Sequence, residues 1–251
     1  MHHLACSLFS KGHQVHVLYS KYPHEQFSIE VPYEIHWVHH YNFATINLNI
    51  FSFSNVLGPL AEKEKFDVIH GNAEEAYWSG KIAKRNKSTY VFTSHTPNIP
   101  ITGMLKGMMR PIRFLKNLNT YFLRQGIIEA DQVVVFSHFS RDLIMKGLNT
   151  TCANKIKVIS PGVESSWFEV ERKPSSGSEL LFWGRIEEEK GLRELFHALK
   201  TVSKMVKDIR LTIVGEGNRL REYKSLVSDL SLTDRVEFAG WLCSTEIQNL
   251  T

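Results

Sequence analysis

The sequence has 251 residues, of which 43% are hydrophobic and 22% charged, and its formal net charge is +4. This length suits one large or two ordinary α/β domains, and the balanced composition excludes a disordered or fibrous chain. No apolar run approaches the roughly 18 residues of a membrane span, and the first residues lack the features of a secretory signal. The three cysteines are far apart and odd in number, so we expect a reduced, cytoplasmic protein without a disulfide framework.

Helices and strands are expected to alternate along the first two thirds of the chain, because the spacing of apolar residues switches repeatedly between the two periods. The expected strands cover residues 14–19, 34–38, 67–70, 89–94, 132–136 and 155–159. The expected helices cover residues 1–11, 73–87, 103–125 and 137–147, with a further helix ending near residue 65. Such alternation predicts a parallel sheet covered by helices on both faces.

The polar stretch 170–178 contains Pro, Gly and several Ser residues, which is typical of a linker. After this linker, strands and helices are again expected to alternate. The strands cover residues 180–183, 211–214 and 235–238, and the helices cover residues 192–206 and 220–230. This order is half of a doubly wound nucleotide-binding sheet. We therefore expect a first domain over 1–169 that lacks its opening strand, and an incomplete second domain over 179–251.

Positive charge is concentrated in the first domain. Between Glu75 and Glu129 there is no acidic residue, whereas nine residues are basic. A segment of one sign predicts an anionic partner such as phosphate, an acidic membrane surface or nucleic acid, unless it is simply a solvated face. No nucleic-acid-binding motif accompanies it, so we expect no nucleic-acid partner.

The long basic helix combines this charge with apolar residues, so it is a candidate for peripheral contact with the inner face of an anionic membrane or with another anionic partner. The alternative is a core helix with a solvated basic edge. The candidate contact residues are Lys106, Arg110, Arg113 and Lys116.

The strongest local motif, GRIEEEKG at residues 184–191, lies between the first strand of the second domain and the next helix. Ligands of open α/β sheets bind at such strand ends, where the helix offers free N–H groups. Gly184 with Arg185 and Lys190 is therefore expected to bind a diphosphate, Arg185 in bidentate fashion and Lys190 as a point charge. Alternatively, the three glutamates complement the helix dipole and pair with both cations.

Weaker candidates follow neighbouring strands. Gly215 and Glu216 occupy the turn after the next strand, where ordinary turn chemistry is the simpler interpretation. His95 and His70 each follow a strand of the first domain and are expected to face a cleft between the domains, where an imidazole could donate a hydrogen bond to phosphate or sugar. Taken singly, each histidine is more often structural.

Other site classes are not expected. His36, His39 and His40 invite a metal interpretation, but His36 and His39 point to opposite faces of a strand, and we find no carboxylate or cysteine that completes a set. The Gly-x-Ser-x-Gly elbow of serine hydrolases and the Walker A pattern are absent. We therefore expect neither a metal site nor a P-loop.

Several motifs together resemble glycosyltransferase family 4, the group 1 glycosyl transferases. In chain order they are KGHQVHV (11–17), ADQVVVFS (130–137), KIKVISPGV (155–163), FWGR (182–185) with KG (190–191), TIVGEG (212–217) and RVEFAG (235–240). The resemblance runs the length of the chain. It implies a GT-B fold, in which two Rossmann-like domains enclose the active site.

The resemblance also implies a retaining transfer of a sugar from a nucleotide-diphosphate sugar to an acceptor hydroxyl, without a metal or other cofactor. It places Arg185 and Lys190 on the donor diphosphate and His95, as the catalytic-site histidine, beside the donor sugar. The family's glycine-rich loop would lie before Met1 and its paired glutamates beyond Thr251, so we expect a fragment. The expected role is polysaccharide or glycolipid synthesis with a sugar or lipid-linked acceptor. A non-catalytic nucleotide-sugar or anion-binding module is the alternative.

Overall fold

The computed structural model describes residues 2–21, 30–39, 42–43, 46–47, 49–95, 110–148, 153–170 and 177–250. The chain divides into two compact units, Met1–Pro161 and Gly162–Thr251. Most of the expected linker at 170–178 lies outside the described residues, as does Lys106.

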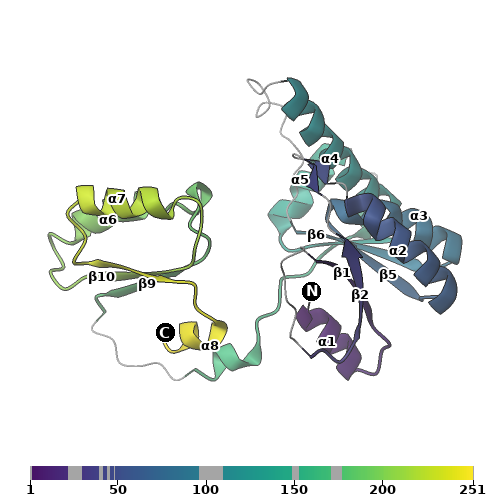
Figure 1. Cartoon of the computed structure of the whole chain (residues 1–251), viewed down its shortest axis with the longest axis horizontal. Coiled ribbons are helices and arrows are strands. Elements are labelled where there is room, and N and C mark those ends of the chain that lie inside the picture. The colour runs from purple at the N-terminus through teal and green to yellow at the C-terminus, as the bar shows by residue number, and fades with distance from the viewer. Residues whose placement is uncertain are drawn as a thin grey trace. The chain divides into compact units, whose positions relative to one another are not determined.

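The first unit contains a four-stranded parallel sheet in the order β5-β6-β7-β8 and a separate parallel pair, β1-β2 (Figure 1). The strands are β1 (His16–Lys21), β2 (Glu34–His39), β3 (Asn42–Phe43), β4 (Ile46–Asn47), β5 (Val68–Asn72), β6 (Thr89–Ser94), β7 (Gln132–Val135) and β8 (Ile156–Val158). The two short strands β3 and β4 form an antiparallel pair. The predicted parallel α/β arrangement is confirmed.

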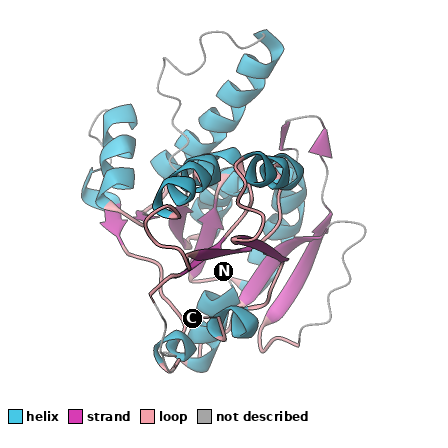
Figure 2. Ribbon diagram, turned by 90° about the vertical axis from the view of Figure 1, so that its left-hand side faces the viewer, coloured by secondary structure: helices cyan, strands magenta, loops and turns pink. Residues whose placement is uncertain are grey.

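Helices cover these strands, as Figure 2 also shows. They are α1 (His2–Ser10), α2 (Asn49–Glu64), α3 (Ser79–Asn86), α4 (Arg110–Glu129) and α5 (His138–Leu148), with short 3₁₀ helices η1 (Glu74–Trp78) and η2 (Ala153–Lys155). Helix α2 packs on β1 and β2, α3 on β5 and β6, and α5 on β7 and β8. Their apolar faces bury Phe92, Ile127, Val133, Val135 and Ile144 completely.

One predicted helix of this unit is divided. The pattern at 73–87 indicated a single helix, but the structure has η1 followed by α3. The side chain of Tyr90 reaches the turn between them and donates a hydrogen bond of 3.2 Å to the carbonyl oxygen of Ala76. The same carbonyl also accepts a hydrogen bond from the Ser79 amide, which closes the last turn of η1. The buried Tyr90 side chain thus packs against the end of η1, a contact that local periodicity does not indicate.

The second unit has a three-stranded parallel sheet in the order β11-β10-β9. Its elements are η3 (Ser165–Phe168), β9 (Glu179–Trp183), η4 (Glu188–Lys190), α6 (Leu192–Val202), β10 (Arg210–Val214), α7 (Leu220–Asp229), β11 (Val236–Gly240) and α8 (Ser244–Gln248). Helices α6 and α7 lie along one face of the sheet and α8 lies on the other side (Figure 1).

The core of this unit forms because α6 has an apolar stripe, with Leu192, Phe196 and Leu199 spaced to face the sheet. Phe196 and Ile213 are fully buried. The periodicity predicted that α6 continues to residue 206, but the helix ends at Val202. Met205, although correctly spaced, is 83% exposed, so its burial does not favour a longer helix.

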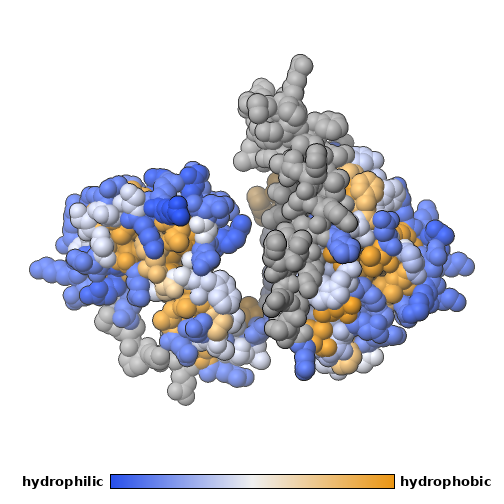
Figure 3. Space-filling model, viewed as in Figure 1, coloured by the Kyte–Doolittle hydropathy of each residue, from blue (hydrophilic) through white to orange (hydrophobic). Residues whose placement is uncertain are grey.

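Hydrophilic residues cover much of the visible face of each unit, with apolar patches between them (Figure 3). Among the described helices, none combines the length and the apolar character that crossing a bilayer requires.

Candidate functional site

The turns after β9 and β10 approach each other closely in the second unit. The Gly184 amide donates to the carbonyl of Val214, at 3.0 Å, and the Ile186 amide donates to the carbonyl of Glu216, at 2.8 Å. A Cβ atom on Gly215 would lie 2.0 Å from the Gly184 oxygen. Glycine at position 215 therefore serves this contact between backbones, and the two turns form one rigid rim at the carboxyl ends of the strands.

Two cations extend from this rim. The side chain of Arg185 is 73% exposed and lies 3.1 Å from the carboxylate of Glu189, four residues later. Lys190 is exposed, and among the described residues it has no ion-pair partner. Of the two interpretations of this motif, pairing of the cations with glutamates therefore holds for Arg185. Lys190, which has no such partner in the described part of the chain, stays available for a diphosphate.

Lys190 does not belong to the helix that follows this motif. Lys190 ends the 3₁₀ helix η4, and α6 begins two residues later, after Gly191 adopts a left-handed conformation with φ of +69°. An acidic residue, Glu194, occupies the first turn of α6, where it complements the helix dipole. Lys190 therefore does not oppose that dipole from within the helix.

Neighbouring acidic residues in this rim are also paired. Arg219 contacts Glu188 and Glu222 at 2.6 Å each, and the side chain of Glu187 accepts a hydrogen bond of 3.2 Å from the Asn218 amide. These contacts link η4 to the turn after β10. Two of the three glutamates therefore hold the turns together, and Glu189 is the one that faces Arg185. The side chain of Glu216 is exposed.

In the first unit, His95 lies at the carboxyl ends of the parallel strands. It directly follows β6, its Nε2 is 3.1 Å from Oδ1 of Asn72 at the end of β5, and its ring meets the edge of Phe136, which follows β7. An amide oxygen only accepts, so this contact places the imidazole proton on Nε2 and leaves Nδ1 as an acceptor. Burial lowers the pKa of His95, which favours the neutral ring.

His70 does not follow its strand as the sequence suggested. Strand β5 extends to Asn72, so His70 lies within the sheet, where its Nε2 is 2.7 Å from the hydroxyl of Thr93 on β6. Burial, together with the charge of His95, lowers the pKa of His70. Asn72, which the sequence analysis did not single out, occupies the strand end and contacts His95. Its only sequence signal was its position two residues after a candidate histidine.

The structure describes the side chains of only the second half of the basic helix. Arg110, Arg113 and Lys116 belong to α4, but their side chains lie outside the described part of the structure. From residue 120 onward, α4 packs Phe122, Leu123 and Ile127 into the core. This half of the helix is therefore a core-packing element.

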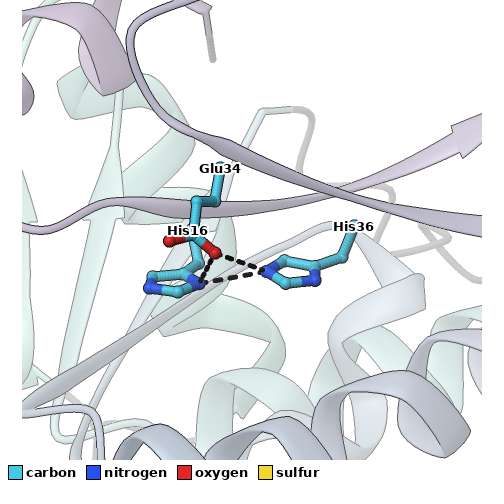
Figure 4. Close-up of side chains that lie close together, drawn as sticks. All are labelled: His16, Glu34 and His36. Atoms are coloured by element: carbon cyan, nitrogen blue, oxygen red, sulfur yellow. Dashed lines mark hydrogen bonds and ion pairs between the residues drawn. The ribbon is translucent and has the colours of Figure 1, made fainter.

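A second cluster lies at the amino ends of β1 and β2, where His16, Glu34 and His36 point toward one another (Figure 4). No carboxylate was expected to complete a set with His36 and His39. That expectation was wrong for His36, because Glu34 lies beside it. Glu34 stands two residues before His36 on the same strand face, and the parallel register pairs its Cα with that of His16. Residues 16 and 34 are too far apart in sequence for spacing to reveal the contact.

Comparison with known families identifies both units. The first 167 residues match the model of Glycosyltransferase Family 4, and residues 163–251 match that of Glycosyl transferases group 1. An uncharacterized glycosyltransferase of Bacillus subtilis is 26% identical over 202 residues, which are 79% of this chain and 53% of that protein. The alpha-monoglucosyldiacylglycerol synthase of Streptococcus pneumoniae is 26% identical over 77% of this chain and 46% of its own length. The chain thus spans about half the length of these curated relatives.

Solved structures agree on the fold. WaaG, a glycosyltransferase involved in lipopolysaccharide biosynthesis, superposes with a TM-score of 0.64 at 14% identity, over 98% of this chain and 66% of that one. Anabaena HepE in complex with UDP superposes with a TM-score of 0.61 at 16% identity, over 86% and 58% of the two chains. These likenesses confirm the predicted GT-B type of fold. With both family models matched in the expected order, the chain belongs to glycosyltransferase family 4, the group 1 glycosyl transferases.

Proposed function

We propose that the protein transfers a sugar from a nucleotide-diphosphate sugar to an acceptor hydroxyl, with retention of the anomeric configuration. The observation that carries this proposal is the rim formed by the turns after β9 and β10, which presents Arg185 and Lys190 beyond the carboxyl ends of parallel strands. Ligands of open α/β sheets bind at this edge. Negative charge grows on the nucleoside diphosphate as it leaves, and two cations at a preorganised rim stabilise it.

Arg185 can exchange its present partner for a phosphate at small cost. Its side chain is 73% exposed and that of Glu189 is 60% exposed, and pairs of this kind contribute about 0–1 kcal/mol to stability. Two oxygen atoms of a phosphate group can bind the guanidinium in bidentate fashion, and a diphosphate carries more negative charge than the glutamate does. Glu189 therefore competes only weakly with the donor diphosphate for the Arg185 guanidinium.

His95 is proposed to contact the donor sugar. With Nε2 bound to Asn72, the neutral ring keeps Nδ1 as an acceptor for a sugar hydroxyl. Asn72 acts as the positioning residue that selects this tautomer. His70 supports the same edge from inside the sheet through Thr93. Gly215 and Glu216 are proposed to shape the donor side of the rim.

The broader role is proposed to be the synthesis of a cell-surface polysaccharide or a glycolipid on the cytoplasmic side of the membrane. The pneumococcal relative is named as a glucosyldiacylglycerol synthase, and the structural relative WaaG is described as acting in lipopolysaccharide biosynthesis. The acid-free segment between Glu75 and Glu129 would favour an anionic acceptor or membrane surface. Within it, Lys106, Arg110, Arg113 and Lys116 are the proposed contacts.

Calorimetric titration of the chain with uridine, guanosine and adenosine diphosphates tests the diphosphate site. We expect Arg185→Ala and Lys190→Ala each to weaken binding about tenfold or more, because a hydrogen bond to a charged group contributes about 1.5–3 kcal/mol. Glu189→Gln should leave affinity unchanged or increase it, since it frees Arg185. Arg210→Gln is the matched control, because Arg210 begins β10 at the opposite edge and bonds the Asp234 carbonyl.

Equal affinity of the wild type and both cation variants would contradict the assignment. A second assay distinguishes an enzyme from a non-catalytic binding module: the protein is incubated with a panel of nucleotide sugars and acceptors. Release of nucleoside diphosphate supports transfer, whereas binding of nucleotide sugar without release supports a non-catalytic module.

A further inference from the structure

The cluster of His16, Glu34 and His36 has the chemistry of a metal site. The Nδ1 atom of His16 lies 3.0 Å from Nε2 of His36 and 3.4 Å from Oε2 of Glu34. The third separation, from His36 Nε2 to Glu34 Oε2, is 3.9 Å. The three side chains therefore bring one potential ligand atom each into a triangle with sides below 4 Å (Figure 4).

The size of this triangle fits a transition-metal ion. A circle through three points separated by 3.0, 3.4 and 3.9 Å has a radius of about 2.0 Å, so one position lies that far from both nitrogens and from the oxygen. Zinc binds imidazole nitrogen at about 2.0–2.1 Å and carboxylate oxygen at about 2.0–2.2 Å. Two imidazoles and one carboxylate form a ligand set that first-row divalent ions accept, with positions left for water.

The fold holds the His16 imidazole in place before any ion arrives. The His16 side chain is only 4% exposed, and its ring meets the edge of Phe66. The rings of His16 and His36 are nearly parallel, with 7° between their planes, and meet through the two nitrogen atoms that lie 3.0 Å apart. Phe66 itself packs against the core of the first unit. His16 is thus fixed by packing, which lowers the ordering cost of binding at this ligand.

Access to the site is through the carboxylate. The Glu34 side chain is 63% exposed, and that of His36 is 25% exposed. A second carboxylate, Glu64 at the end of α2, lies near enough for both histidines to contribute to its lowered pKa, although its hydrogen bond with Lys63 is the largest cause. Lys63 pairs with Glu64 at 2.7 Å, so the exposed Glu34 carboxylate is the main negative charge that favours a cation at the cluster.

We propose that His16 Nδ1, His36 Nε2 and Glu34 Oε2 bind one divalent transition-metal ion, most readily Zn²⁺, which joins β1 to β2. Metal binding displaces the proton of the hydrogen bond between the two ring nitrogens, because both must offer a lone pair to the ion. That proton passes to the solvent or to the other nitrogen of the ring that carried it. The ion would be structural. Phe66 precedes the amino end of β5, whereas Asn72 ends that strand, so six residues of nearly extended chain, or roughly 20 Å, separate the site from the edge that carries His95.

Titration of the chelator-treated chain with Zn²⁺ and Co²⁺ tests this proposal by calorimetry, absorption spectroscopy and thermal unfolding. We expect one ion per chain at this cluster, a Co²⁺ spectrum of nitrogen and oxygen ligands, and a higher melting temperature with Zn²⁺ than with chelator. Glu34→Gln and His36→Gln should each weaken binding at least about tenfold and remove the thermal shift. Glu34 is exposed, so its variant keeps the fold.

Two further variants isolate the cluster from other metal-binding groups. His13→Gln removes an exposed histidine outside it and should leave Zn²⁺ affinity unchanged. Cys6→Ser removes the thiol that lies 3.7 Å from His2 Nε2, and it should also leave binding unchanged, with no thiolate charge-transfer band in the wild-type Co²⁺ spectrum. Absence of binding by the wild type, wild-type affinity in both Glu34→Gln and His36→Gln, or loss of binding in Cys6→Ser would overturn the proposal.

Discussion

Replacement of Gly215 by alanine should disrupt the rim on which the proposed diphosphate site depends. The new Cβ atom would lie 2.0 Å from the carbonyl oxygen of Gly184 and 3.0 Å from its carbon, and both belong to the backbone. Relief of this overlap requires the turn after β9 to move by about 1 Å or more. In addition, φ at position 215 is +134°, a conformation that side-chain-bearing residues rarely adopt.

The magnitude follows from these contacts. Backbone strain costs about 1–3 kcal/mol, and the two hydrogen bonds that join the turns contribute about 0.5–1.5 kcal/mol each. We therefore expect the second unit to lose about 3 kcal/mol of unfolding free energy. For a unit of this size, that loss lowers the melting temperature by about 12 °C or more. Nucleoside diphosphate affinity should fall as well, because Arg185 moves with the displaced turn.

Differential scanning calorimetry gives the melting temperature, and hydrogen exchange locates the change. The amides of Gly184 and Ile186 should lose protection in Gly215→Ala, whereas those of β5 to β8 should keep it. The matched control is Gly162→Ala, since nothing lies within 4 Å of a Cβ atom at that position. A melting temperature within about 2 °C of the wild type, with unchanged protection of both amides, would refute the reasoning.

Two further predictions concern the first unit. Asn72→Ala should lower the rate of sugar transfer without abolishing nucleotide binding, because His95 loses the group that fixes its tautomer; the effect is measured as kcat against KM. Glu129→Gln should stabilise the protein at pH 7–8 but not near pH 4, as measured by thermal unfolding across pH. Burial raises the pKa of Glu129 above 4.5, so its contribution to stability is greatest below pH 4.5 and falls as the pH rises through the native pKa.

Each of these predictions has a control. For the first, Asn72→Asp keeps an acceptor for the Nε2 proton and should retain more activity than Asn72→Ala; equal losses would show that the tautomer is irrelevant. For the second, Glu62→Gln removes an exposed carboxylate and should leave the dependence of stability on pH nearly unchanged. A gain in Glu129→Gln that is the same at pH 4 and pH 8 would indicate that burial of the charge is not the cause.

Periodicity in the amino-acid sequence was enough to predict most of the helices and strands in their order and the parallel sheets, although not the antiparallel pair of β3 and β4. It also indicated that His95 and Arg185 each follow a strand of their own sheet. It succeeds because an amphipathic segment has to turn one face to the core, and because parallel strands place their carboxyl ends together. The break between η1 and α3 was not predicted in this way, and the contact of Tyr90, from a later strand, with the end of η1 is equally invisible to local spacing.

Contacts between side chains from distant segments were decided only by the tertiary structure. The pairing of Asn72 with His95 requires the ends of β5 and β6 to be adjacent, and the cluster of His16, Glu34 and His36 requires one particular register of β1 against β2. A shift of one residue would turn Glu34 and His36 to the other face. Local spacing specifies which face a side chain takes, whereas strand register and packing specify which distant group it meets.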